Sequence, residues 1–180
     1  MSLRSFVAVE VGPRPALARL RDEAAALDRD LKAVAPENLH VTLRFLGDVD
    51  ASEVLAILEA LREACAGVAP FTMRLRGVGA FPSPARARVL WAGLEGADPL
   101  ARVADGLSRR LGAPDKPFAA HVTLARAKTP KGAAKVPAFV ARHRDWQGDE
   151  VPVERIVLMR SELAREGPTY TPLGAAALEA

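Results

Sequence analysis

His40-Val41-Thr42-Leu43 recurs letter for letter as His121-Val122-Thr123-Leu124 in the second half of the 180-residue chain. Two of the three histidines therefore open the same tetrapeptide. Successive side chains of a β-strand point to opposite faces, so each histidine shares a face with the threonine two residues on. The valine and leucine of each copy then face the other way. The repeat predicts two strands that each present an imidazole beside a hydroxyl and anchor in a core through the opposite face.

Two such strands facing one cleft would bring together two imidazoles and two hydroxyls. Imidazole exchanges protons near neutral pH, and a hydroxyl stabilises negative charge that builds up on a nearby oxygen. We therefore expect His40, His121, Thr42 and Thr123 to be catalytic, in proton transfer around a phosphate group. A pair of histidines predicts a single pH optimum near neutrality.

The sequence gives little support for a metal or a cofactor. Each motif supplies one nitrogen ligand per strand, and no H-x-x-x-H pair or cysteine cluster accompanies it. No G-x-x-x-x-G-K-[ST] loop is present, so ATP-driven ligation is not indicated. We expect no metal and no cofactor. Cys65 falls on an apolar helix stripe and is expected in the core, and His143, between two arginines, is expected at the surface.

Composition is that of a globular protein, with 49% hydrophobic and 26% charged residues. The net charge of +3 permits a polyanionic ligand without requiring one. The single cysteine suits a reducing compartment. The apolar run over residues 6–9 is too short for a signal peptide, and no stretch is long enough to span a membrane. A cytoplasmic monomer with no membrane partner is expected.

Apolar periodicity predicts the same order of elements in both halves of the chain. The first half reads as a strand over 6–11, a helix with its stripe at Leu17, Leu20, Ala24, Leu27 and Leu31, a motif strand over 39–46, a turn at Gly47-Asp48, a helix between Asp50 and Gly67, and a strand from residue 71. The second half reads as a strand over 89–92, a helix between Asp98 and Gly112, the second motif strand, a short helix over 138–142, and strands over 153–159 and 169–173.

This order predicts an α+β fold made of two pseudo-symmetric lobes. Each lobe is expected to be an antiparallel sheet packed with helices, and the two motif strands are expected to meet at a central cleft. The halves span about residues 1–80 and 85–165, with a C-terminal strand closing the sheet. No linker separates them, so one domain over 1–180 is expected.

Two H-x-T-x motifs on strands in a chain of this size resemble the two-histidine (2H) phosphoesterase superfamily. The flanks resemble its bacterial and archaeal RNA 2′,3′-cyclic phosphodiesterases, also called 2′-5′ RNA ligases and LigT-like proteins. They are Pro36-Glu37-Asn38-Leu39, Arg44-Phe45-Leu46-Gly47, Gly79-Ala80-Phe81-Pro82, Val89-Leu90-Trp91-Ala92-Gly93, Leu124-Ala125-Arg126 and Leu158-Met159-Arg160-Ser161-Glu162-Leu163. The resemblance covers nearly the whole chain.

The resemblance implies hydrolysis of RNA 2′,3′-cyclic phosphate ends to 2′-phosphomonoesters without a metal, with His40 as the proton donor and His121 as the proton acceptor. It also implies that Arg126 binds phosphate and that Phe45 contacts the base or ribose. Strand parity disagrees, because both lie five residues after a histidine and should face away. Either a bulge or the strand end reorients them, or they are structural. Arg44 has the parity of His40 and is expected to face the groove.

Other hypotheses about the function remain open. The resemblance implies RNA with 2′,3′-cyclic ends as the partner, including tRNA fragments, and the same site run in reverse would join tRNA-like halves through a 2′-5′ bond. An RNA-end binding or repair module with little turnover is a third reading, disfavoured by the two intact motifs. Four further arginines read either as a basic flank for RNA or as ordinary exposed residues: Arg74, Arg76, Arg86 and Arg88.

Overall fold

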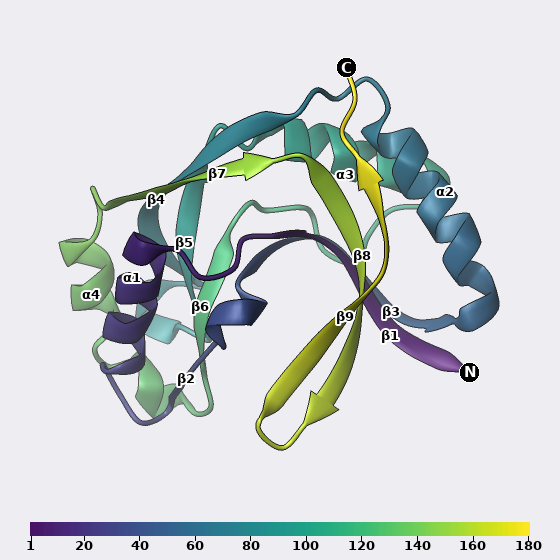
Figure 1. Ribbon diagram of the computed structural model, residues 1–180. Coiled ribbons are helices and arrows are strands. Elements are labelled where there is room, and N and C mark those ends of the chain that lie inside the picture. Colours follow the sequence, from purple (N-terminus) through teal and green to yellow (C-terminus); the bar gives the residue numbers. More distant parts are fainter.

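The computed structural model describes residues 1–180 and contains nine strands and four α-helices (Figure 1). The strands are β1 (Ser2–Glu10), β2 (Leu31–Ala33), β3 (His40–Asp50), β4 (Phe71–Phe81), β5 (Val89–Glu95), β6 (Val122–Ala127), β7 (Gln147–Val153), β8 (Arg155–Ala164) and β9 (Gly167–Ala177). The helices are α1 (Pro15–Ala25), α2 (Val54–Cys65), α3 (Asp98–Leu111) and α4 (Val136–Arg142). None of these helices is long and apolar enough to cross a membrane.

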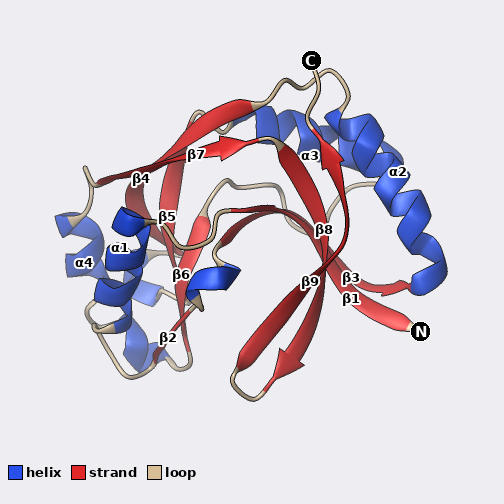
Figure 2. Ribbon diagram, in the orientation of Figure 1, coloured by secondary structure: helices blue, strands red, loops and turns tan.

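The strands form two antiparallel sheets, which confirms the predicted α+β class. One sheet has the strand order β3-β1-β8-β9, and the other has the order β2-β6-β5-β4-β7. The strands lie at the centre of the molecule and the helices at its periphery (Figure 2). Helices α1 and α4 pack beside the five-stranded sheet, whereas α2 and α3 pack against each other and against strands of the four-stranded sheet.

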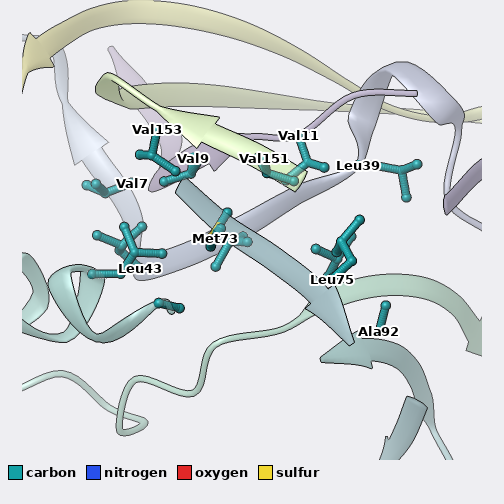
Figure 3. Close-up of a cluster of buried hydrophobic side chains, with 14 of the residues drawn as sticks. Val7, Val9, Val11, Leu39, Leu43, Met73, Leu75, Ala92, Val151 and Val153 are labelled. Carbon is teal, nitrogen blue, oxygen red and sulfur yellow. The ribbon is translucent and has the colours of Figure 1, made fainter. Parts of the chain in front are cut away.

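One hydrophobic core joins the two sheets. It contains 40 buried residues drawn from both sheets and all four helices, and Figure 3 shows part of it. Val7, Val9 and Leu43 of the four-stranded sheet contribute to it, as do Met73 and Leu75 of the five-stranded sheet. Because the apolar faces of both sheets are used in this shared core, the motif strands are fixed relative to one another.

The sheets do not follow the two halves of the sequence. Strand β4 of the first half belongs to the five-stranded sheet, and β8 of the second half belongs to the four-stranded sheet. The chain passes from one sheet to the other at Glu154, so the strand predicted over 153–159 begins only at Arg155, and Val153 belongs to the strand before it. Val153 ends β7 and Ile156 lies near the start of β8, and both are buried, so the apolar run shows no break at the crossover.

The first helix is shorter than its apolar stripe predicts. It ends at Ala25, and Leu31 is buried as the first residue of β2. The carboxylate of Asp28 accepts a hydrogen bond from the backbone N–H of Asp30 at 2.8 Å. An aspartate side chain that bonds the backbone two residues on favours a turn over a helix. The short strand β2 follows this turn and pairs with β6. It was not predicted, because Leu31 continues the helical spacing of the preceding leucines.

The first motif strand is longer than predicted, because Gly47 does not end it. Gly47 has φ = +70° and lies at a β-bulge, where β1 pairs Ser5 with Gly47 and Phe6 with Phe45. A glycine adopts this left-handed conformation without steric cost, and such bulges bend a strand without ending it. Strand β3 therefore continues to Asp50. The capping box predicted from Asp50 and Glu53 is present just beyond it.

Candidate active site

The two motif strands lie against each other although they belong to different sheets. His40 is the first residue of β3, and His121 immediately precedes β6. The alternation is the predicted one. The valine and leucine of each motif are buried in the core, whereas the two histidines and two threonines are only partly covered. Below, the side of β3 and β6 that carries the histidines is called the site face.

Both imidazoles are held in the same way by the backbone two residues earlier. Nδ1 of His40 lies 2.6 Å from the carbonyl oxygen of Asn38, and Nδ1 of His121 lies 2.7 Å from that of Ala119. A carbonyl oxygen only accepts hydrogen bonds, so each Nδ1 carries the proton and donates it. This fixes the tautomer and leaves Nε2 of both rings as the nitrogen that can exchange a proton with a ligand.

The two Nε2 atoms differ in their present partners. Nε2 of His40 lies 2.9 Å from the hydroxyl of Thr42, in a hydrogen bond whose direction depends on whether the ring is neutral or charged. Nε2 of His121 makes no such bond to Thr123. The site is therefore symmetric in its backbone support and asymmetric in its side-chain contacts.

Aromatic side chains surround each imidazole. The ring of His40 lies 5.1 Å from that of Phe6 and 5.3 Å, edge-on, from that of Tyr170. The ring of His121 lies 5.0 Å, edge-on, from that of Phe81 and 6.3 Å from that of Trp91. These contacts fix the ring planes and remove water from one side of each imidazole.

A glycine keeps Trp91 flat on its sheet. Gly79 lies directly opposite Trp91 across the β4–β5 ladder. A Cβ atom at Gly79 would lie 2.3 Å from the indole, far inside contact distance. The indole then reaches Phe81, at 5.2 Å between ring centroids, and through it the His121 ring. Gly79 thus supports the position of His121.

Burial is the largest cause that lowers the pKa of both histidines below the ordinary value of 6.5. The hydrogen bonds to the carbonyls of Asn38 and Ala119 oppose it, and the positive charge of Arg126 adds to it in both cases. The charge of His121 lowers the pKa of His40 further. Burial also raises the pKa of Tyr170, while Arg126 lowers it. The charge of Arg126 thus acts on three groups of the site.

A β-bulge brings Arg126 to the site face, which resolves the conflict with strand parity. Strand β5 pairs Trp91 with Thr123 and Val89 with Arg126. Trp91 and Val89 are two residues apart and share a face, whereas Thr123 and Arg126 are three apart. The extra residue is Leu124, which has no partner on β5, and it moves Arg126 to the face of Thr123.

Strand β3, the first motif strand, also contains a β-bulge. Strand β1 pairs Ala8 with Thr42 and Phe6 with Phe45, so a bulge places Phe45 on the face of Thr42. The Phe45 ring lies 6.4 Å from the Phe6 ring and is 66% exposed. An aromatic ring that exposed is open to a ligand.

The expectation that Arg44 faces the groove is wrong. The bulge that turns Phe45 toward the site turns Arg44 away, opposite the buried Val7. Its guanidinium donates to the carbonyl of Gly112 at 2.7 Å and to that of Leu111 at 3.3 Å. Arg44 therefore caps the C-terminal end of α3, where a positive charge is favoured.

Several sequence expectations outside the site have clear outcomes. Arg74 and Arg76 are paired with Glu150 and Glu95, so their charge is already compensated. His143 lies 2.9 Å from a carboxylate oxygen of Glu23, connecting α4 to α1 away from the site. Cys65 is buried, and burial raises the pKa of its thiol to about 11.

Sequence reasoning missed Tyr170 and Phe6 as neighbours of His40. Both lie on strands whose spacing from the motif carries no signal, and only the pairing of β1 with β3 and β8 brings Phe6 beside His40. It also missed that Asn38 acts through its carbonyl oxygen, because any residue supplies that group. The structure contains no group of three or more His, Cys, Asp or Glu side chains that could hold a metal ion.

Comparison with known proteins gives concordant matches in sequence and structure. A family model described as LigT like phosphoesterase matches residues 7–91 and 94–170. An RNA 2′,3′-cyclic phosphodiesterase of Methanothermobacter thermautotrophicus is 32% identical, over 96% of this chain and 97% of the relative. One of Aeropyrum pernix is 44% identical, over 87% and 92%.

Solved structures agree with these relatives. A crystal structure of a Thermus thermophilus protein has a TM-score of 0.77 at 38% identity and covers 98% of each chain. The crystal structure of E. coli LigT complexed with 3′-AMP has a TM-score of 0.71 at 27% identity and covers 99% of each chain. The chain therefore belongs to the LigT-like phosphoesterase family.

Proposed function

We propose that the protein hydrolyses RNA 2′,3′-cyclic phosphate ends to 2′-phosphomonoesters by acid–base catalysis between His40 and His121. The observation that carries the proposal is the matched support of the two imidazoles. Each donates Nδ1–H to a backbone carbonyl and keeps Nε2 for chemistry, on strands that lie against each other. The activity in the names of the relatives, RNA 2′,3′-cyclic phosphodiesterase, supports the same conclusion.

In this mechanism Nε2 of His121 accepts a proton from a water molecule. The water oxygen forms a bond to phosphorus, and the bond from phosphorus to the ribose 3′ oxygen breaks in line with it. Nε2 of His40 gives its proton to the departing 3′ oxygen. The product carries a phosphate on the 2′ oxygen and a free 3′ hydroxyl. Each positioned proton transfer contributes roughly 10²- to 10⁴-fold to the rate.

The charge on the substrate matters for the role of His40. Burial, Arg126 and His121 all favour a neutral His40 in the ligand-free protein. A cyclic phosphate carries one negative charge, and a nearby negative charge favours the protonated form of an imidazole. Substrate binding therefore supplies part of the interaction that charges the acid where it is needed.

The remaining site residues act on the substrate rather than on the protons. Thr42 and Thr123 share the site face with the histidines and donate hydrogen bonds to the non-bridging phosphate oxygens as negative charge develops. Arg126 binds the phosphate through its charge, and the exposed ring of Phe45 stacks on the terminal base or ribose. The natural substrate class is RNA with cyclic ends, including tRNA fragments, and the active form is a monomer.

The test is an RNA oligonucleotide with a 2′,3′-cyclic end, incubated with the protein in excess EDTA. We expect opening at an undiminished rate and a product that comigrates with an authentic 2′-phosphate standard. The His40→Ala/His121→Ala double variant is the control for contaminating nuclease. Activity that disappears in EDTA and returns with a divalent ion would contradict the mechanism, and a 3′-phosphate product would contradict the assigned leaving group. A ligated 2′-5′ product in place of hydrolysis would favour the reverse reaction.

A further inference from the structure

A lysine lies beside Arg126 in a position that the sequence did not reveal. Strand β2 pairs Lys32 directly with Arg126 of β6. Residues directly opposite each other in an antiparallel pair have their side chains on the same face. Since Arg126 is on the site face, Lys32 is on it as well, one strand further from the centre of the sheet. Its side chain is exposed.

The Lys32 ammonium extends toward the other sheet. A Cβ atom built on Gly167 would lie 4.0 Å from Nζ of Lys32, and Gly167 begins β9 at the tip of the β8–β9 hairpin. In Figure 1 this hairpin tip and β2 lie at the same end of the molecule. The next residue, Pro168, accepts a hydrogen bond from the Asn38 side chain at 2.8 Å, and the carbonyl of Asn38 holds His40. The Lys32 ammonium thus lies near the hairpin tip whose Pro168 is hydrogen-bonded to Asn38.

The charge of Lys32 is not compensated within the protein. All eight ion pairs of the structure involve other residues, and neither Lys32 nor Arg126 takes part in one. Neither side chain donates a hydrogen bond to another residue. Several arginines elsewhere are paired with carboxylates, for example Arg74 and Arg155. Two neighbouring uncompensated cations on the site face attract an anion in addition to the reacting phosphate.

We propose that Lys32 binds the internucleotide phosphate on the 5′ side of the terminal nucleotide. The inference rests on the proposed function and specifies its substrate. Arg126 lies on the site face with Thr123, and its charge acts on both histidines, so we assign Arg126 to the reacting phosphate. Lys32 lies on the next strand outward from Arg126, so we place the RNA chain along the line from Arg126 to Lys32. A substrate of two or more nucleotides uses Lys32, and a single nucleoside 2′,3′-cyclic phosphate has no phosphate to offer it.

Three substrates separate this contact from the chemistry. They are adenosine 2′,3′-cyclic phosphate, the ApA dinucleotide with a 2′,3′-cyclic end, and the same dinucleotide with an uncharged methylphosphonate linkage. The quantity compared is the ratio of kcat/KM for each dinucleotide to that for the nucleoside. Lys32→Gln should lower the ratio for the charged dinucleotide about three- to tenfold. It should leave the ratio for the methylphosphonate dinucleotide as in the wild type.

Salt dependence gives a second readout, which loss of packing would not change. The plot of log kcat/KM against log salt for the charged dinucleotide should become shallower by about 0.7 in Lys32→Gln, the value for one phosphate contact on a single strand. Lys135→Gln is the matched control, because Lys135 is exposed and precedes α4, outside the site. It should keep the wild-type ratio and slope.

Two results would overturn the inference while leaving the proposed function intact. In the first, Lys32→Gln leaves the charged-dinucleotide ratio unchanged. In the second, the ratio falls equally with the uncharged linkage. In both, the wild-type protein still opens all three substrates. A wild-type protein that opened none of them would refute the proposed function and this inference with it.

Discussion

Nε2 of His40 lies 2.9 Å from the hydroxyl oxygen of Thr42, two residues further along the same strand. This hydrogen bond joins the acid of the proposed reaction to a donor of the proposed phosphate site. Both groups must turn to the substrate when it binds, so the bond is exchanged for contacts with the phosphate. His121 and Thr123 form no such bond. In the proposed reaction, only the first motif must therefore break an internal hydrogen bond when the substrate binds.

Replacing either threonine by valine should lower kcat while the fold persists. Valine keeps the β-branched shape and removes only the hydroxyl, so a hydrogen bond to the developing charge is lost. We expect a decrease of about tenfold to a hundredfold for Thr42→Val and for Thr123→Val. Steady-state kinetics measures the loss, and an unchanged thermal unfolding midpoint is the control. Wild-type kcat in the double variant would remove the threonines from the mechanism.

The pH profile of kcat/KM should be bell-shaped with its maximum below 6.5, the ordinary imidazole pKa. Lowered pKa values mean that the histidine pair keeps its single proton at lower pH, so the active form is most populated on the acid side. Arg126→Gln removes a charge that lowers both pKa values and should move the profile to higher pH, whereas Arg126→Lys should not. NMR titration of the ring protons checks the free protein. A maximum above 6.5, or an acid shift in Arg126→Gln, would contradict this electrostatic account.

Arg44→Leu should lower stability and leave catalysis nearly unchanged. The guanidinium donates to two carbonyls at the end of α3, and its loss leaves them without these donors. We expect the free energy of unfolding to fall by about 1–2 kcal/mol, measured by urea denaturation. Arg126→Gln is the matched comparison, since it removes an exposed arginine of the site face and should affect kcat/KM instead. An Arg44→Leu protein of normal stability and low activity would contradict this structural role and indicate that Arg44 acts at the site.

The chain should unfold as one domain in a single cooperative transition. Each sheet combines strands from both sequence halves, so neither half can keep a complete sheet alone. Tryptophan fluorescence reports on the five-stranded sheet through Trp91 and Trp146, and far-ultraviolet circular dichroism reports on both sheets. The two signals should change together in urea. Separated transitions would indicate two domains.

The alternating pattern around each histidine was predictable because it depends only on strand geometry. His40 and Thr42 share a face for the same reason that Val41 is buried. The family was predictable because the motifs and their flanks are local in sequence. The strand that carries Lys32 was not, since Leu31 continues a helical spacing and a single side-chain hydrogen bond, from Asp30 N–H to Asp28, ends the pattern.

The faces of Arg44, Phe45 and Arg126 also could not be read from the sequence. One extra residue in a strand reverses every side chain that follows it, and nothing in the composition of β3 or β6 marks the bulge. The partner strands β1 and β5 determine where the extra residue lies. Tertiary pairing, rather than local propensity, therefore places Arg126 on the site face.

A substrate with sulfur in place of the ribose 3′ oxygen tests the division of roles between the histidines most directly. On the normal substrate, His40→Ala and His121→Ala should each lose at least about 10²-fold in kcat/KM, and the double variant should lose far less than the product. Thiolate departs without a proton, so the 3′-thio substrate should restore His40→Ala toward the wild-type rate and leave His121→Ala impaired. Restoration of His121→Ala instead would reverse the assignment. Restoration of neither would contradict acid–base catalysis by this pair.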